Sequence, residues 1–186
     1  MKRILYLMMA VNFLSVPVFA SDTIIRNYSN TVIENGSVKY EENYSYNSDN
    51  DDSKNVEIII GEDIIKTGNI IKGCGVASYI QTDSGSAMLP LRAVSAAVAG
   101  IEQGVNVNVL WDSNSKSAHI NYKNNDIVFK SNSSEMFINN KKYEIDNGAF
   151  AEIKDKQLFV PLRALCKALD VKVEWDALSK TVTLFK

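Results

Sequence analysis

The sequence predicts an α+β fold: antiparallel sheets curved around a helix, with two related β-β-α-β-β copies in one compact domain. Three observations predict it. A motif occurs twice, and the apolar spacing changes from helical to strand-like inside each occurrence. About 130 residues, from Val56 to Lys186, follow the apolar N-terminus and the polar segment after it, and this length is enough for one core. Such self-similarity indicates a duplicated supersecondary unit. The two occurrences are Met88 to Val94 (MLPLRAV) followed by Trp111 and Asp112, and Phe159 to Leu165 (FVPLRAL) followed by Trp175 and Asp176.

Residues 1–20 have the composition of a secretory signal peptide. Lys2 and Arg3 form a basic start, the stretch from Ile4 to Val16 is almost entirely apolar, and Val18 and Ala20 stand where a signal peptidase reads. The apolar stretch is shorter than the roughly 20 residues that span a bilayer. We expect cleavage after Ala20 and a secreted or cell-wall-associated chain with no transmembrane span. An uncleaved leader that anchors the chain is the alternative.

Residues 21–55 are rich in Asn, Ser, Tyr, Asp and Glu. Such a segment buries too little apolar surface to offset its conformational entropy, so the sequence predicts a disordered acidic and polar linker. The Asp49 and Asp51 pair lacks the central Gly and the distal Glu of a loop calcium site. Across the whole chain, 20 Lys and Arg residues stand against 22 Asp and Glu residues. Without a basic field, nucleic acid is excluded as a partner.

In the second copy, residues 126–186, a helix is expected to start at Pro161, which needs no N–H in a first helical turn. Leu162, Leu165 and Leu169 follow at helical spacing, and Asp170 ends the run. Val171, Val173 and Trp175 then alternate with charged residues, which predicts a half-buried strand. A turn over 176–180 and a strand over 181–185 complete a β-hairpin.

The first copy, residues 56–122, repeats this order after Pro90. We expect Ile58 to Ile60 and Met136 to Ile138 to be the matching opening strands. With this alignment, equivalent residues of the two copies lie farther apart along the sequence at the opening strands than at the prolines, and farther apart at the prolines than at the tryptophans. The difference predicts seven-residue additions near 66–74 and 100–106 of the first copy. These added residues would either extend the core or bind a partner.

The string FVPLRALCKALDVKVEWD with the TVTL that follows it resembles the copper amine oxidase N-terminal domain family, also called the stalk domain. The match is close over 135–186 and looser over 56–122. The resemblance implies a small antiparallel sheet curved around a helix, remote from any copper, in secreted and cell-wall proteins of bacteria. Where the family has Gly-Arg before the second motif, this chain has Asp155, Lys156 and Gln157.

The resemblance does not imply amine oxidation. A copper site of that enzyme needs three imidazoles, and this chain has one histidine, His119. No Asn-Tyr pair is followed by Asp or Glu, the setting of the quinone precursor. His119 alternates with polar residues on a strand, and no triad pattern accompanies it. We therefore expect no catalytic residues, no cofactor and no metal.

The repeated residues of the two motifs have structural interpretations beside functional ones. Arg92 and Arg163 face the positive end of a helix dipole, so we expect each to form a fork to Asp112 or Asp176, or to a neighbouring acceptor; an anion site is the alternative. Trp111 and Trp175 are expected in the core, with a sugar-stacking platform as the alternative. Cys74 and Cys166 are expected to be free thiols rather than a disulfide.

We therefore expect a secreted, non-enzymatic stalk-type module with an extracellular or cell-envelope structural or binding role. Its partner would be a protein or a cell-wall glycan. Two alternatives remain open from the residues alone: a carbohydrate or peptidoglycan binding module, and an extracellular hydrolase of unrecognised type. The structural signature is expected to be Pro90, Arg92, Trp111, Asp112, Pro161, Arg163, Trp175 and Asp176.

Overall fold

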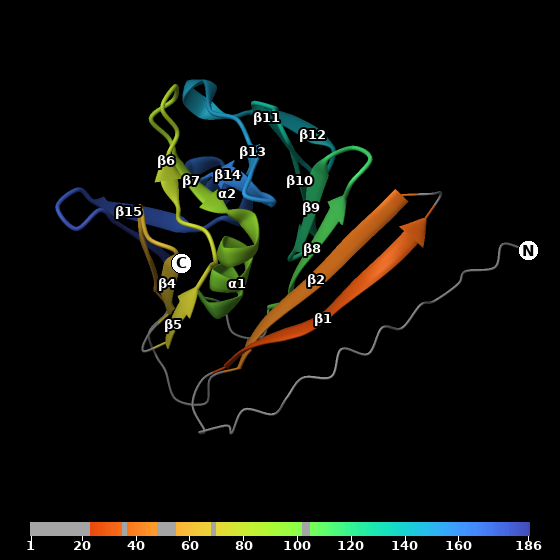
Figure 1. Cartoon of the computed structure of the whole chain (residues 1–186), viewed down its shortest axis with the longest axis horizontal. Helices are drawn as coiled ribbons and strands as arrows, with labels where there is room; N and C mark the ends of the chain where they lie inside the picture. The colour runs from red at the N-terminus through yellow and green to blue at the C-terminus, as the bar shows by residue number, and fades with distance from the viewer. Residues whose placement is uncertain (1–22, 35–36, 48–54, 68–69, 102–104) are drawn as a thin grey trace, which may run out of the picture.

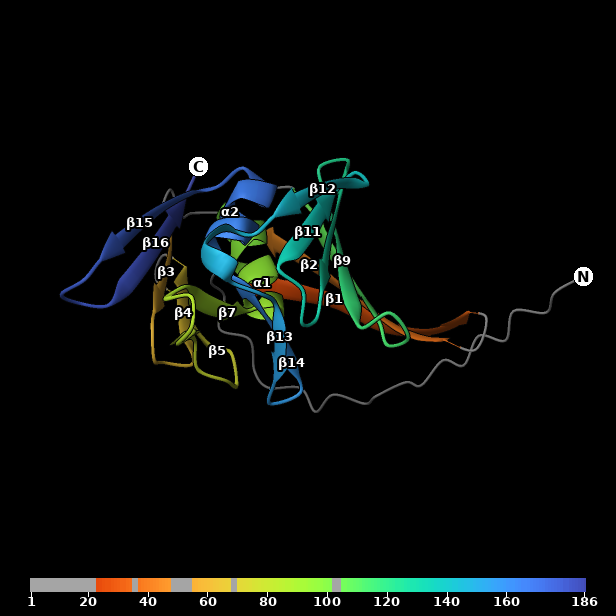
Figure 2. The ribbon, with the colours of Figure 1, turned by 90° about the horizontal axis from the view of Figure 1, so that it is seen from above.

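The computed structural model describes residues 23–34, 37–47, 55–67, 70–101 and 105–186. These residues form three antiparallel sheets around two α-helices (Figure 1; Figure 2). The predicted signal peptide, residues 1–20, lies outside the described residues. Among those described, no helix is both long and apolar enough to cross a membrane.

The largest sheet has the strand order β1-β2-β8-β9-β10-β11-β12, and a five-stranded sheet has the order β15-β16-β3-β4-β5. The strands of the first are β1 (Thr23–Glu34), β2 (Ser37–Asn47), β8 (Val107–Asp112), β9 (Ser117–Tyr122), β10 (Asn125–Lys130), β11 (Glu135–Ile138) and β12 (Lys141–Glu144). Those of the second are β15 (Lys172–Asp176), β16 (Thr181–Phe185), β3 (Val56–Ile59), β4 (Ile64–Thr67) and β5 (Ile70–Gly73).

A four-stranded sheet lies between them, with the order β13-β14-β7-β6. Its strands are β13 (Glu152–Lys154), β14 (Gln157–Pro161), β7 (Ala87–Pro90) and β6 (Tyr79–Ile80). The two helices, α1 (Leu91–Ile101) and α2 (Leu162–Leu169), follow directly after β7 and β14, and a short 3-10 turn covers Asp146–Gly148. The expectation of an α+β fold with antiparallel sheets curled around helices is confirmed at this level.

The helices form where the spacing predicts them. In α2, Leu162, Leu165 and Leu169 are buried, while Arg163 and Lys167 are exposed. The helix ends because Asp170 adopts a left-handed conformation with φ 52°, which a short polar residue tolerates. Apolar residues at the same spacing along α1 are also buried: Leu91, Val94, Val98 and Ile101. Both helices therefore direct one apolar stripe into the core.

The central strands β7 and β14 are buried on both faces. Leu89 lies opposite Val160 and contributes to the main core with it, whereas the neighbouring Met88 and Phe159 are fully buried on the other face. The Tyr79 ring covers this second face, with its centroid 5.1 Å from that of Phe159. A strand pair buried on both faces explains why both copies of the motif are so apolar.

The two outer sheets repeat one another in register. Val56 pairs with Thr67 and Ile127 pairs with Ile138, and these two pairs are separated along the chain by the same offset as Pro90 and Pro161. The same offset relates Ile64 opposite Gly73 to Glu135 opposite Glu144. The closing hairpin of each half pairs with the opening strand of the other half. Strand β9 of the first half pairs with β10 of the second, and β16 of the second half pairs with β3 of the first.

This register corrects the expected alignment of the opening strands. β3 corresponds to β10 and not to Met136–Ile138, so the stretch 66–74 is no addition: β4 and β5 have full counterparts in β11 and β12. The short apolar runs of β3, β10 and β11 are too alike for spacing alone to distinguish them. The addition near 100–106 begins within α1, whose last residue, Ile101, is buried. At that position the addition extends the core.

The expected disordered linker is wrong for Thr23–Glu34 and Ser37–Asn47. These residues form the hairpin β1-β2, and β2 continues onto β8 from Lys39 opposite Asp112 to Tyr44 opposite Val107. The polar composition of this segment did not reveal two features. Its Tyr, Thr, Val and Ile residues favour strands. The edge of β8 also supplies hydrogen-bonding partners, which composition cannot show. Residues 48–54 lie outside the described part.

Candidate binding site

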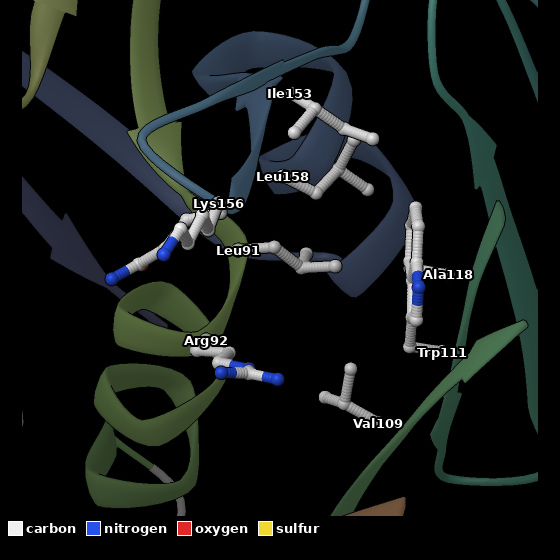
Figure 3. Close-up of a pocket in the computed structure, with 9 residues that line it drawn as sticks. Leu91, Arg92, Val109, Trp111, Ala118, Ile153, Lys156 and Leu158 are labelled. Carbon is white, nitrogen blue, oxygen red and sulfur yellow. The ribbon is translucent and has the colours of Figure 1, made fainter. Parts of the chain in front are cut away.

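An open pocket of about 240 Å³ lies between the start of α1, the β8-β9 hairpin and the β13-β14 hairpin (Figure 3). It contains a half-buried tryptophan beside aliphatic side chains, with cationic and amide groups at the rim. The lining residues are Leu91, Arg92, Val109, Trp111, Ala118, Ile153, Lys156, Gln157 and Leu158.

Each wall of the pocket follows from local structure. Trp111 and Val109 share one face of β8, because side chains two residues apart on a strand point the same way, and α1 begins with Leu91 directly after buried Pro90. The third wall is a tight hairpin whose turn residues, Asp155 and Lys156, have φ of 49° and 63°. Positive φ at both positions is the geometry of a hairpin turn that matches strand twist.

The pocket can hold a small ligand with an apolar or ring face and a negative group. The Trp111 indole faces the aliphatic Leu158 and Leu91 across the pocket in Figure 3. Among the residues that the structure describes, the two charged ones in its lining, Arg92 and Lys156, are both cationic. Arginine recognises carboxylate and phosphate through a planar fork of donors. An aromatic face, aliphatic walls and cationic groups at the rim are suited to binding such a ligand.

The sequence singled out two of the lining residues, for which structural roles were expected. Arg92 and Trp111 come from the predicted signature, and the structure brings them together at one pocket. Ile153, Lys156 and Leu158 were missed as site residues, because they come from the opposite half of the chain. The available signal was the turn at Asp155–Gln157, where the sequence departs from the family pattern.

The second signature is arranged differently, and two expectations for it are wrong. Arg163 is exposed and makes no hydrogen bond or ion pair among the described residues, while Asp176 accepts hydrogen bonds within its own turn from Leu178 N (2.9 Å) and Ser179 Oγ (2.7 Å). These bonds lower the pKa of Asp176. The fork between Arg163 and Asp176 is therefore absent there. Trp175 is 50% exposed, so it does not belong to the core.

The family model of the Copper amine oxidase N-terminal domain matches residues 74–184, more than half of the chain. The chain belongs to this family. No curated protein and no solved structure matches it. Its membership agrees with the fold of curled antiparallel sheets around helices, and all eight signature residues lie inside the matched range. The chain is thus a stalk-like module of the copper amine oxidase N-terminal type.

The family's name refers to a copper enzyme, but the residues of this domain do not fit a copper centre. The chain has one histidine, His119, and its Nδ1 lies 3.5 Å from Asp126 Oδ1 on the neighbouring strand. Among the described residues, no three of His, Cys, Asp and Glu gather into a group that could hold a metal ion. We derive no chemistry through copper for this domain.

A polar bridge closes the curled four-stranded sheet of the domain. Tyr79 Oη donates to Glu152 Oε1 at 2.6 Å, and Gln81 Nε2 donates to the same oxygen at 3.0 Å. Burial and then the bond to Glu152 raise the pKa of Tyr79. Since the folded state holds this proton more tightly than the unfolded chain, the bridge stabilises the fold below a pH of about 10 and loses effect above it. We assign it a structural role over Phe159.

Both cysteines of the domain are free thiols, with Cys166 buried in α2 and Cys74 half-buried after β5. Burial raises the pKa of Cys166 to about 12, and burial with the nearby negative charge of Asp63 raises that of Cys74 to about 11. Thiolates are the reactive form. We expect iodoacetamide at pH 8 to leave both thiols unlabelled in the folded protein and to label both in denaturant, as measured by intact mass. Rapid labelling of folded Cys166 would contradict its placement in the core.

Proposed function

We propose that this chain is a secreted or cell-wall-associated, non-catalytic module that binds a cell-envelope component through the Trp111 pocket. The pocket itself is the observation that carries the proposal. The part of its lining that the structure describes combines an aromatic face, aliphatic walls and two cations. The signal-peptide composition of residues 1–20 supports an extracellular location, and membership of a stalk-like family supports a role without catalysis.

We infer further that the domain arose by duplication of one β-β-α-β-β unit. The offset along the chain that the outer sheets share with Pro90 and Pro161 supports this inference. A duplication explains why the closing hairpin of each half pairs with the opening strand of the other half. It also explains why the pocket needs residues from both halves, because Trp111 lies in one and Ile153 in the other.

Within this role, the ligand that the pocket favours is a carbohydrate of the cell wall that carries a carboxylate, as the sugar acids and peptide stems of peptidoglycan do. Tryptophan faces suit the apolar face of a ring, and the Arg92 guanidinium suits a carboxylate. The other alternative, an extracellular hydrolase, has no comparable support: among the described residues, His119 contacts Asp126 rather than a nucleophile.

Soluble muropeptides titrated into the mature chain test this function. We expect saturable binding that Lys156→Glu weakens by about tenfold, because one rim cation is replaced by an anion beside a ligand carboxylate. Lys180→Glu, in the β15-β16 turn and outside the pocket lining, is the matched control and should bind normally. Equal affinity of the two variants would place the ligand elsewhere, and an absence of binding to muropeptides and intact cell walls would overturn the proposal.

A further inference from the structure

The chain contains the same strand pattern twice. Val107–Asp112 reads VNVLWD and Val171–Asp176 reads VKVEWD, so both follow Val-x-Val-x-Trp-Asp. Each pattern provides the first strand of a hairpin in the same register, since Trp111 lies opposite Ala118 and Trp175 opposite Val182, seven positions on in both cases. We call these two segments the first and the second template.

The first template is covered along its outer edge. Strand β2 pairs with it antiparallel through six consecutive residues, from Lys39 opposite Asp112 to Tyr44 opposite Val107. All six residues of the template are buried or half-buried, with Val107 0% and Val109 5% exposed. At the first template, the strand added to the edge is thus β2, a part of the same chain.

The second template is bare along the same edge. Among the described strands, β15 has β16 as its one neighbour, and all five residues of β15 are exposed. The β15-β16 hairpin projects from the molecule on the side away from β1 and β2 (Figure 1; Figure 2). No strand in the described part of the chain covers the second template as β2 covers the first.

The bare edge also exposes an apolar face. Val173 lies opposite Leu184, and Trp175 lies opposite Val182. Leu184 and Val182 are 0% and 1% exposed, so Val173 and Trp175 continue the core-facing side of the sheet beyond the core. They are nevertheless 37% and 50% exposed. Lys172 and Glu174, the charges that commonly protect an edge strand, lie on the opposite face.

We propose that the second template is a docking site for an extended strand of a partner protein, added antiparallel to β15 as β2 is added to β8. The partner segment is of the β2 type: opposite Trp111 and Val109, which correspond to Trp175 and Val173, the chain itself places Tyr40 and Glu42. Main-chain hydrogen bonds to the edge would give affinity, and Val173 and Trp175 would select the alternate side chains. This site is separate from the Trp111 pocket and does not depend on its ligand.

A synthetic peptide with the sequence of residues 37–47 is the probe. It contains no tryptophan, so its binding to the mature chain can be followed by the emission of the protein's own tryptophans. We expect one peptide to bind per chain, with a blue shift, because the chain's own β2 already occupies the first template. Trp175→Ala and Val173→Asp should each weaken binding about tenfold or more, whereas Leu178→Ser, in the same hairpin but 98% exposed in its turn, should not.

Two N-methylated peptides distinguish strand addition from simple apolar adhesion. One carries methyl groups on the amides of odd-numbered residues and the other on those of even-numbered residues, so each loses the donors of one edge. Strand addition predicts that one of the two loses binding and the other keeps it. Equal binding of both, binding of a scrambled peptide, or binding unaffected by Val173→Asp would overturn the proposal. Self-association of the chain without peptide binding would also overturn it, since the occupant would then be a second copy.

Discussion

A chain of residues 48–186 is expected to be less stable than one of residues 21–186 by about 3 kcal/mol or more, because six paired residues of β8 lose their neighbour β2 and each lost hydrogen bond contributes about 0.5–1.5 kcal/mol. The loss also exposes the edge of β8, so aggregation is expected to accompany unfolding. Denaturant titration of both chains measures the difference through the midpoint and the slope.

A single substitution separates loss of the ladder from loss of chain length. Glu42 lies opposite Val109 in the middle of the β2-β8 pairing. Glu42→Pro removes one main-chain donor there and should lower the denaturation midpoint, whereas Glu42→Ala keeps the main-chain donor and serves as the control that leaves the ladder intact. If the deletion and Glu42→Pro both left stability unchanged, residues 21–47 would be a tether after all.

Phe159→Ala is expected to destabilise the domain by about 3–5 kcal/mol, the usual cost of removing a fully buried aromatic side chain. Phe159 is 0% exposed, and its ring packs beside Tyr79 beneath the bridge to Glu152. The substitution leaves a cavity between β7, β14 and this bridge. Thermal and chemical denaturation should both show the loss.

Phe185→Ala provides the matched aromatic control. Phe185 is half-buried at the end of β16, where Lys172 Nζ lies 5.9 Å from its ring centroid. Its truncation exposes less new surface and creates no enclosed cavity, so the loss of stability should be clearly smaller. Equal losses at the two positions would contradict the assignment of a second buried face to β7 and β14.

The local structure of the motifs could be predicted from sequence because it depends on spacing within a few residues. Helical spacing over Leu162–Leu169 and alternation over Val171–Trp175 each depend on one local period, and the helix and the strand both form. The strand was expected to be half-buried, but all five residues of β15 are exposed. The register of the outer sheets required more than this. Several apolar runs compete for the opening strand, and the long-range pairings of β16 with β3 and of β9 with β10 decide among them.

How far each tryptophan is buried depends on neighbouring strands that lie far away in the sequence, so no local pattern predicts it. The same alternation precedes Trp111 and Trp175, yet Trp111 is half-buried beside the core and Trp175 is half exposed. The difference follows from long-range topology, since β8 has strand β2 beside it and β15 lies at an edge of its sheet. For the same reason the polar segment 23–47, which reads as a linker by composition, is part of the largest sheet.

The two tryptophans also separate the two binding proposals. The chain has two indole N–H groups; one, on Trp111, lines the pocket, and the other, on Trp175, lies on the bare template. Each gives its own resonance in a two-dimensional NMR spectrum of ¹⁵N-labelled protein. Perturbation of one resonance without the other therefore assigns a ligand to its site.

The most direct test of the central claim, that this module binds a cell-wall glycan in the Trp111 pocket, is a muropeptide titration of the mature chain followed at these two resonances. The account predicts a saturable shift of the Trp111 indole while that of Trp175 stays in place. A shift confined to Trp175, or no shift of either resonance at saturating muropeptide, would contradict it.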